Sequence, residues 1–261
     1  MGLETHYLVI CIAAFLGSGL TLFSGFGLGT LLTPVFAIFF PIELAIGMTA
    51  VVHLLNNIFK FFLLGKHASK EVVMKFGIPS LIAAFLGAWA LTLISDKAPV
   101  FVYELGSKEF SITPVKLTMS ALLIFFALAE VIPFLSKISL NKNSLAVGGF
   151  ISGFFGGLSG NQDALRSAFL VKAGLSKEQF IASGIVIACL VDVARLFVYN
   201  RLEVLGSAGM NNGLVIAAVL CAFAGAYLGN LFLKKTTLAF VQKVVMAMLL
   251  VLAVLLGAGI L

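Results

Sequence analysis

Charged and amide side chains interrupt two long apolar stretches of this chain at helical spacing. His53, Asn57 and Lys60 follow one another at i, i+4 and i+7, which places them on one face of a helix. Asp192 and Arg195 lie three residues apart in the other stretch. Because such groups are costly inside an apolar segment, they are concentrated at the ligand and ion sites of membrane proteins.

A third polar group follows a glycine-rich break in the second half of the chain. Directly after Ser159 and Gly160 come four polar residues that we expect in the first turns of a half-helix: Asn161, Gln162, Asp163 and Arg166. Guanidinium groups, amides, hydroxyls and helix N-termini all donate hydrogen bonds to oxyanions. The sequence therefore predicts a site for a small oxyanion. The expected substrate-binding residues are Ser24, Gly25, Gly27, Asn57, Lys60, Ser159, Gly160, Asn161, Gln162, Arg166 and Arg195.

Three side chains are candidates for proton coupling: His53, Asp163 and Asp192. Histidine titrates near neutral pH, and buried carboxyl groups can do so. Structural alternatives remain open at this stage. The i, i+3 pairs Asp163 with Arg166 and Asp192 with Arg195 can simply neutralise each other. Lys60 can extend along its helix to the membrane surface.

The composition indicates that lipid surrounds most of the chain. Of the 261 residues, 61% are hydrophobic and only 11% are charged, with a net charge of +6, whereas a soluble domain carries about 25% charged residues. The cations form no cluster of the kind that nucleic acid requires. The three cysteines, Cys11, Cys189 and Cys221, show no disulfide or metal-binding spacing. We therefore expect an integral membrane protein with no metal, no cofactor and no nucleic acid partner.

Six apolar runs of 20 to 24 residues have the length of a membrane-spanning helix. They cover residues 42–65, 76–95, 114–136, 180–200, 213–233 and 239–261. Two further apolar segments, 6–40 and 145–171, are interrupted by glycines. We expect each of these to form a broken hairpin that enters the membrane and returns to the same side.

The distribution of loop cations favours such re-entrant hairpins over full crossings. If both broken segments return, ten loop Lys and Arg residues share one side and four lie on the other. If both cross, the split is six against eight. Because cytoplasmic loops carry an excess of Lys and Arg, we expect two hairpins, six crossings and both termini outside.

A weak internal repeat relates the two halves. Shifting the chain by 135 residues aligns Ser24-Gly25 with Ser159-Gly160, Glu43 with Glu178 and Lys60 with Arg195. Each half then holds a broken hairpin and three crossings, an odd number, so the second half must be inverted in the membrane. The expected fold is an all-α membrane protein of two inverted repeats, residues 1–136 and 145–261. Small residues at Gly225 and Gly229 leave a homodimer open.

The glycine-broken sequences FSGFGLG (23–29) and GGLSGN (156–161) resemble those of the sulfite exporter TauE/SafE family. The resemblance extends over essentially the whole chain. It implies a multi-pass carrier of sulfite, sulfonates or related organosulfur anions in the bacterial inner membrane. The motif residues carried over are Ser24, Gly25, Gly27, Gly157, Ser159, Gly160 and Asn161.

Two other functions fit parts of the sequence. An anion channel would use the same pore chemistry. Rhomboid intramembrane proteases carry a GxSG motif, which residues 157–160 match, and an HxxxN motif, which His53 and Asn57 match. Such enzymes also need a histidine after the serine as general base, whereas all three histidines of this chain precede Ser159. We therefore expect a transporter rather than an enzyme.

Overall fold

The fold is built almost entirely of helices. The computed structural model describes residues 3–24, 28–95, 97–106, 108–131, 144–201, 211–232 and 238–261. The helices of the N-terminal half are α1 (Leu3–Ser24), α2 (Leu28–Ala37), α3 (Ile42–Leu64), α4 (Lys70–Val72), α5 (Ile78–Ser95) and α6 (Pro114–Val131). Those of the C-terminal half are α8 (Leu145–Ser159), α9 (Asp163–Leu170), α10 (Lys177–Arg201), α11 (Asn212–Phe232) and α12 (Leu238–Gly257).

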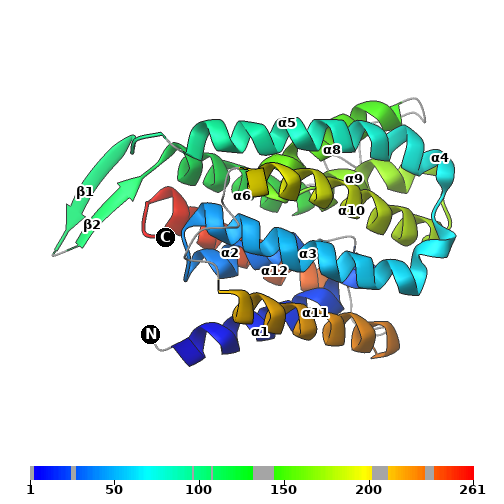
Figure 1. Cartoon of the computed structure of the whole chain (residues 1–261), viewed down its shortest axis with the longest axis horizontal. Helices are drawn as coiled ribbons and strands as arrows, with labels where there is room; N and C mark the ends of the chain where they lie inside the picture. The colour runs from blue at the N-terminus through cyan, green and yellow to red at the C-terminus, as the bar shows by residue number, and fades with distance from the viewer. Residues whose placement is uncertain are drawn as a thin grey trace.

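The long helices lie side by side along the longest axis of the molecule (Figure 1). Four helical segments of the described residues are long and apolar enough to cross a membrane: Ile42–His67, Lys70–Ser95, Lys177–Tyr199 and Asn212–Gly229. Large apolar side chains such as Phe62, Trp89 and Leu220 are exposed on the outside of the bundle, where lipid would cover them. The predicted all-α membrane protein is confirmed.

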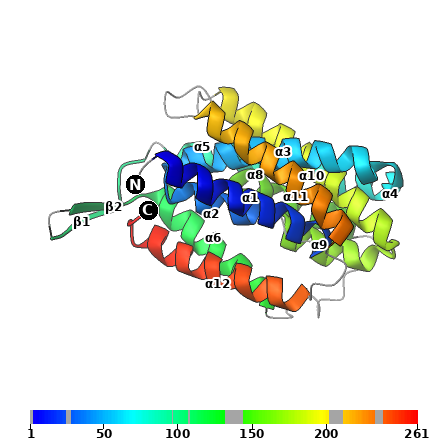
Figure 2. The same cartoon turned by 90° about the horizontal axis from the view of Figure 1, so that it is seen from below.

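A β-hairpin between α5 and α6 was not predicted. Its strands β1 (Phe101–Leu105) and β2 (Lys108–Ile112) pair antiparallel. The hairpin and both chain ends lie at one end of the molecule, and α4 lies at the other (Figures 1 and 2). The hydroxyl of Tyr103 donates a hydrogen bond to the carbonyl of Ala258 (2.5 Å), which ties β1 to the residues just after α12. The predicted topology stays a prediction, because full crossings in place of the two hairpins would also bring both ends to one side.

Both glycine-rich segments are broken, as predicted. After α8, Gly160 adopts the left-handed conformation (φ 79°) that favours glycine and ends the helix. The helix that follows, α9, has eight residues and is about 12 Å long, too short to cross a bilayer. In the first half, α1 ends at Ser24 and α2 begins at Leu28. α2 packs against α1 and α9 packs against α8, which is the arrangement expected of hairpins.

Each broken helix packs closely on a helix from the other half of the chain. In α8, three glycines spaced by four residues face the backbone of α5 and of the helical turn just before it. An added Cβ would collide there with the residue opposite: Gly149 with Phe76, Gly153 with Ser80 and Gly157 with Ala84. The hydroxyl of Ser80 also donates to the carbonyl of Gly149 (2.8 Å). Because the pairs advance together along both helices, α8 and α5 run parallel and at close range.

The same relation holds between α1 and α11. A Cβ on Gly225 would collide with the backbone of Phe15, and one on Gly229 would lie 2.8 Å from the backbone of Gly19. Gly225 and Gly229 therefore pack within the chain, and a homodimer stays a prediction. The pairing of α1 with α11 and of α8 with α5 agrees with the predicted inverted repeat, which itself stays a prediction.

Replacing Gly153 by alanine is expected to destabilise the protein by about 1–3 kcal/mol because the new Cβ would force α8 and α5 apart. Helix propensity alone gives the opposite sign, since alanine is the better helix former by about 1 kcal/mol. Thermal unfolding of the purified protein in detergent measures the difference. Phe150→Ala, at a half-exposed position of the same helix, is the control. A Gly153→Ala protein as stable as wild type would contradict the close packing.

Candidate functional site

Two helices from opposite halves bring the predicted polar side chains together. His53, Asn57 and Lys60 of α3 are at most 6% exposed, and Asp192 and Arg195 of α10 are fully buried. His53 Nδ1 lies 2.6 Å from Asp192 Oδ2. Asn57 Nδ2 lies 3.2 Å from His53 Nδ1. The predicted common face of α3 is confirmed, and it points at α10.

Asp192 joins this face to the guanidinium of Arg195. Arg195 Nε donates to Asp192 Oδ1 over 3.0 Å, and Arg195 Nη2 lies 2.9 Å from the same oxygen. One carboxylate therefore contacts both a histidine and an arginine. Because these groups are shielded from water, their mutual attraction is strong, and so is the penalty for removing one of them.

The break between α8 and α9 supplies the other half of the site. Ser159, Asn161, Gln162 and Asp163 are at most 3% exposed, and Arg166 is 9% exposed. Ser159 Oγ donates to the carbonyl of Phe155 (3.0 Å) and accepts from the backbone amide of Asn161 (3.3 Å). Asp163 and Arg166 form an ion pair within α9. Asn161 and Gln162 precede the first residue of α9, so the prediction that they lie in its first turns is wrong by one or two residues.

Glycine contacts place the break against α10 and α3. A Cβ on Gly160 would collide with the guanidinium of Arg195. A Cβ on Gly29, in the first turn of α2, would lie 3.3 Å from the carbonyl of Gly160 and 3.8 Å from the ring of His53. We call this assembly the polar centre: His53, Asn57, Lys60, Ser159, Gly160, Asn161, Gln162, Asp163, Arg166, Asp192 and Arg195.

Lys60 is directed into the protein, not along its helix to the surface. It is 5% exposed. With the amide of Asn56 oriented to satisfy its neighbours, Asn56 accepts from Lys60 Nζ (3.1 Å) and donates to the carbonyl of Ala222 in α11 (3.3 Å). Ser18 of α1 lies 3.0 Å from the same amide. The alternative that Lys60 only reaches for the membrane surface is wrong.

The charges of the polar centre do not cancel. Arg166 pairs with Asp163, and Arg195 pairs with Asp192, so the neutralising i, i+3 pairs foreseen in the sequence do form. Among the described residues, no carboxylate forms an ion pair with Lys60. Three buried cations therefore stand against two buried carboxylates, and His53 adds a further positive charge whenever it is protonated.

A family model for the sulfite exporter TauE/SafE family matches residues 10–256, nearly the whole chain. The chain belongs to this family. Neither a curated protein nor a solved structure matches it. As a TauE/SafE family member it is a multi-pass membrane protein of a transporter family, and the resemblance noted in its glycine-rich breaks is confirmed.

The TauE/SafE motif of the second half lies in the polar centre. Two guanidinium nitrogens there, Arg166 Nη1 and Arg195 Nη1, are buried without a hydrogen-bond partner in the described part of the chain. The side-chain oxygens Asn161 Oδ1 and Gln162 Oε1 are also buried without a hydrogen-bond partner among the described residues. Buried polar atoms are normally paired. The polar centre thus presents unused hydrogen-bonding atoms to a ligand.

The corresponding motif of the first half, residues 23–29, is described only in part. Gly25 and Gly27 are not among the described residues, and the description stops at the backbone for Ser24. Their role as anion ligands stays a prediction.

Two residues of the site were missed in the sequence. The hydroxyl of Tyr199 donates to the carbonyl of Gly157 at the end of α8 (2.7 Å), and Ser18 contacts the amide of Asn56. Tyr199 follows Asp192 and Arg195 at the spacing that places all three on one face of a helix, so the sequence alone could have predicted its position in the site. Among the described residues, no hydrogen bond joins the hydroxyl of Ser159 to the ring of His53, and Ser159 Oγ donates to the carbonyl of Phe155 instead. The structure therefore does not show the hydrogen-bonded nucleophile and base that a serine protease requires.

Proposed function

We propose that this protein carries sulfite or small organic sulfur oxyanions, such as sulfonates, across the membrane and binds them at the polar centre. The observation that carries the proposal is the excess of buried positive charge. An uncompensated charge in the membrane interior is costly. A bound anion would balance Lys60 and complete the hydrogen bonds of Arg166 and Arg195, so anion binding and charge balance support each other.

The arrangement favours a carrier over a channel. The polar centre lies between two broken helices, the arrangement in which carriers expose a bound ligand to each side in turn, and the described cavity beside it has room for about one water molecule. In the proposed cycle, the two halves rock about the broken helices and expose the bound anion to each side in turn. The membrane potential, negative inside, assists export by about 2.3 kcal/mol per charge per 100 mV, so export would need no coupled ion.

Proton coupling is proposed at the contact between His53 and Asp192. This contact joins α3 to α10 over 2.6 Å, and Asp163 is buried nearby in the same polar centre. Protonation of His53 would add a positive charge beside the anion, so binding of the proton and of the anion would favour each other. Anion flux measured with and without a pH gradient across the membrane tests this role, and flux independent of the gradient would remove it.

Purified protein in liposomes should carry sulfite and methanesulfonate, and Lys60→Met should carry both about tenfold more slowly. A unit charge about 10 Å from an anion contributes about 1.7 kcal/mol at an effective dielectric constant of about 20, which corresponds to about a tenfold change in rate. The measurement is radiolabelled uptake into proteoliposomes. Lys75→Met is the matched control because the side chain of Lys75 is 60% exposed, and it should leave the flux unchanged.

Two outcomes would contradict the proposal. One is a wild-type protein that carries none of these anions. The other is a Lys60→Met protein, folded by size-exclusion chromatography, whose flux equals that of wild type.

A further inference from the structure

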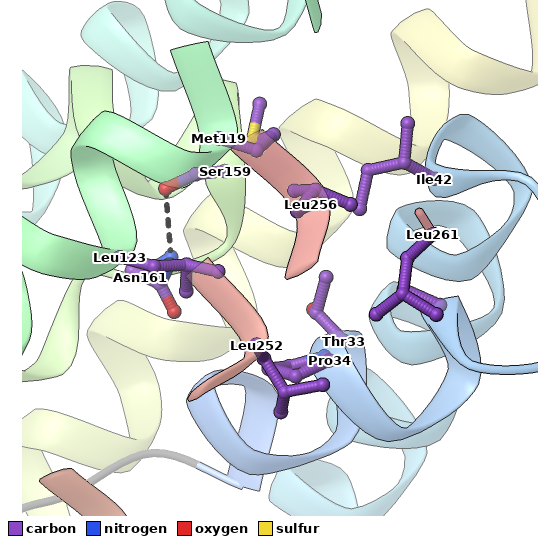
Figure 3. Close-up of a pocket in the computed structure, with 11 residues that line it drawn as sticks. Thr33, Pro34, Ile42, Met119, Leu123, Ser159, Asn161, Leu252, Leu256 and Leu261 are labelled. Atoms are coloured by element: carbon purple, nitrogen blue, oxygen red, sulfur yellow. Dashed lines mark hydrogen bonds between the residues drawn. The ribbon is translucent and has the colours of Figure 1, made fainter. Parts of the chain in front are cut away.

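A small space adjoins the polar centre (Figure 3). It lies between α2, the break after α8, α6 and α12. The volume open to the centre of a water molecule is about 10 Å³, the least that holds one water. Ser159 and Asn161 line this space and also belong to the polar centre, so the space lies next to the proposed anion site.

Two oxygens in the wall of this space have no hydrogen-bond partner in the part of the chain that the structure describes: Thr33 Oγ1 and Asn161 Oδ1. Thr33 is 4% exposed and Asn161 is 3% exposed. Figure 3 shows the two side chains on opposite sides of the space. A group placed between them would have to donate to the amide oxygen of Asn161 and could accept from the hydroxyl of Thr33. A hydroxyl group does both, whereas a methyl group does neither.

Apart from Ser159, the remainder of the wall is apolar. Met119 and Leu123 of α6 and Leu252 and Leu256 of α12 line the space, and each is at most 5% exposed. The two helices are fixed to each other, since the hydroxyl of Ser120 donates to the carbonyl of Ala253 (2.7 Å), and they lie side by side in Figure 2. Because the space has room for only about one water molecule, it fits a terminal hydroxyl group and leaves no room for a longer chain.

We propose that this space is a second subsite, which binds the hydroxyl end of a short hydroxyalkanesulfonate while the polar centre holds its sulfonate group. The proposal rests on the proposed function. The cations hold the charged end and the apolar wall limits the length of the chain. Thr33 and Asn161 select a terminal hydroxyl group over a methyl group.

Matched substrates test the subsite: 2-hydroxyethanesulfonate and ethanesulfonate differ by a single oxygen. Proteoliposomes with the wild-type protein should carry the hydroxylated anion at least tenfold faster in kcat/KM, because buried hydrogen-bonding groups left unpaired discriminate strongly against the analogue that lacks the hydroxyl. In Thr33→Val, which keeps the shape and removes the hydroxyl, this ratio should fall by about tenfold. Sulfite, which has no carbon chain, should be carried as before.

Thr30→Val is the matched control, since Thr30 is as buried as Thr33 and one turn away on α2, and it should keep the wild-type ratio. Equal rates for the two sulfonates in wild type would overturn the subsite, and such an outcome needs no variant to fold. An unchanged ratio in Thr33→Val, or a parallel loss of sulfite flux, would also overturn it. If the wild-type protein carries neither sulfite nor either sulfonate, it is the proposed function that fails.

Discussion

Replacing Asp192 by asparagine is expected to destabilise the protein by about 3–5 kcal/mol, the usual cost of removing one partner from a buried ion pair. Asparagine has the shape of aspartate but no charge. Arg195, which is fully buried, would keep its charge, and its Nε and Nη2 would lose the carboxylate now 2.9–3.0 Å away. His53 would lose its 2.6 Å contact as well. Thermal unfolding in detergent measures the loss, and anion flux should disappear with it.

An exposed ion pair of the same protein provides the control. Lys75 and Glu71 lie 2.8 Å apart, but their side chains are 60% and 67% exposed. Because surface pairs contribute about 1 kcal/mol or less, Glu71→Gln should change the stability by no more than that. If Asp192→Asn and Glu71→Gln unfolded at the same temperature as wild type, the contact of Asp192 with His53 and Arg195 would not stabilise the fold.

Positions along a single helix could be predicted from the sequence because the helix period alone determines them. His53, Asn57 and Lys60 share a face whatever surrounds α3. The i, i+3 pairs of α9 and α10 follow from the same geometry. The break after Ser159 was also predictable, since Gly160 adopts a backbone conformation that few other residues accept.

Contacts between segments far apart in the chain could not be predicted in this way. Spacing within α3 does not say that His53 faces Asp192, 139 residues later. It also does not say that Tyr199 meets the carbonyl of Gly157. The space between Thr33 and Asn161 arises only when α2, α6, α12 and the break come together. The packing of the helices against one another determines these contacts, and this packing cannot be derived from the residue spacing of a single sequence.

The β-hairpin was not predicted, although the residues that indicate it are neighbours in the sequence. Residues 101–105 are rich in aromatic and β-branched side chains, and Gly106 follows with a positive φ of 69°. This is the pattern of a strand that ends in a tight turn. The apolar runs that predict membrane spans do not include this hairpin, because it contains the charged residues Glu104, Lys108 and Glu109.

Removing the guanidinium of Arg166 is expected to lower kcat/KM for the transported anion by about 30-fold or more. Truncating one partner of a buried charged hydrogen bond costs about 2–5 kcal/mol, and each 1.4 kcal/mol is a factor of ten. Arg166 Nη1 is a buried donor without a partner among the described residues, so we expect the anion to be its acceptor. Proteoliposome flux over a range of anion concentrations measures the effect in Arg166→Gln.

The single variant leaves Asp163 buried without its cation, so reduced flux could come from a damaged fold alone. The double variant Arg166→Gln with Asp163→Asn separates the two causes. It removes both charges of the ion pair and should recover most of the stability that the single variant loses, since neutral replacement of a buried pair is far less costly than removal of one partner. The flux should stay low because the donor for the anion is still missing. If the double variant recovered wild-type flux together with its stability, Arg166 would serve only to neutralise Asp163, and the anion would have to bind elsewhere in the polar centre.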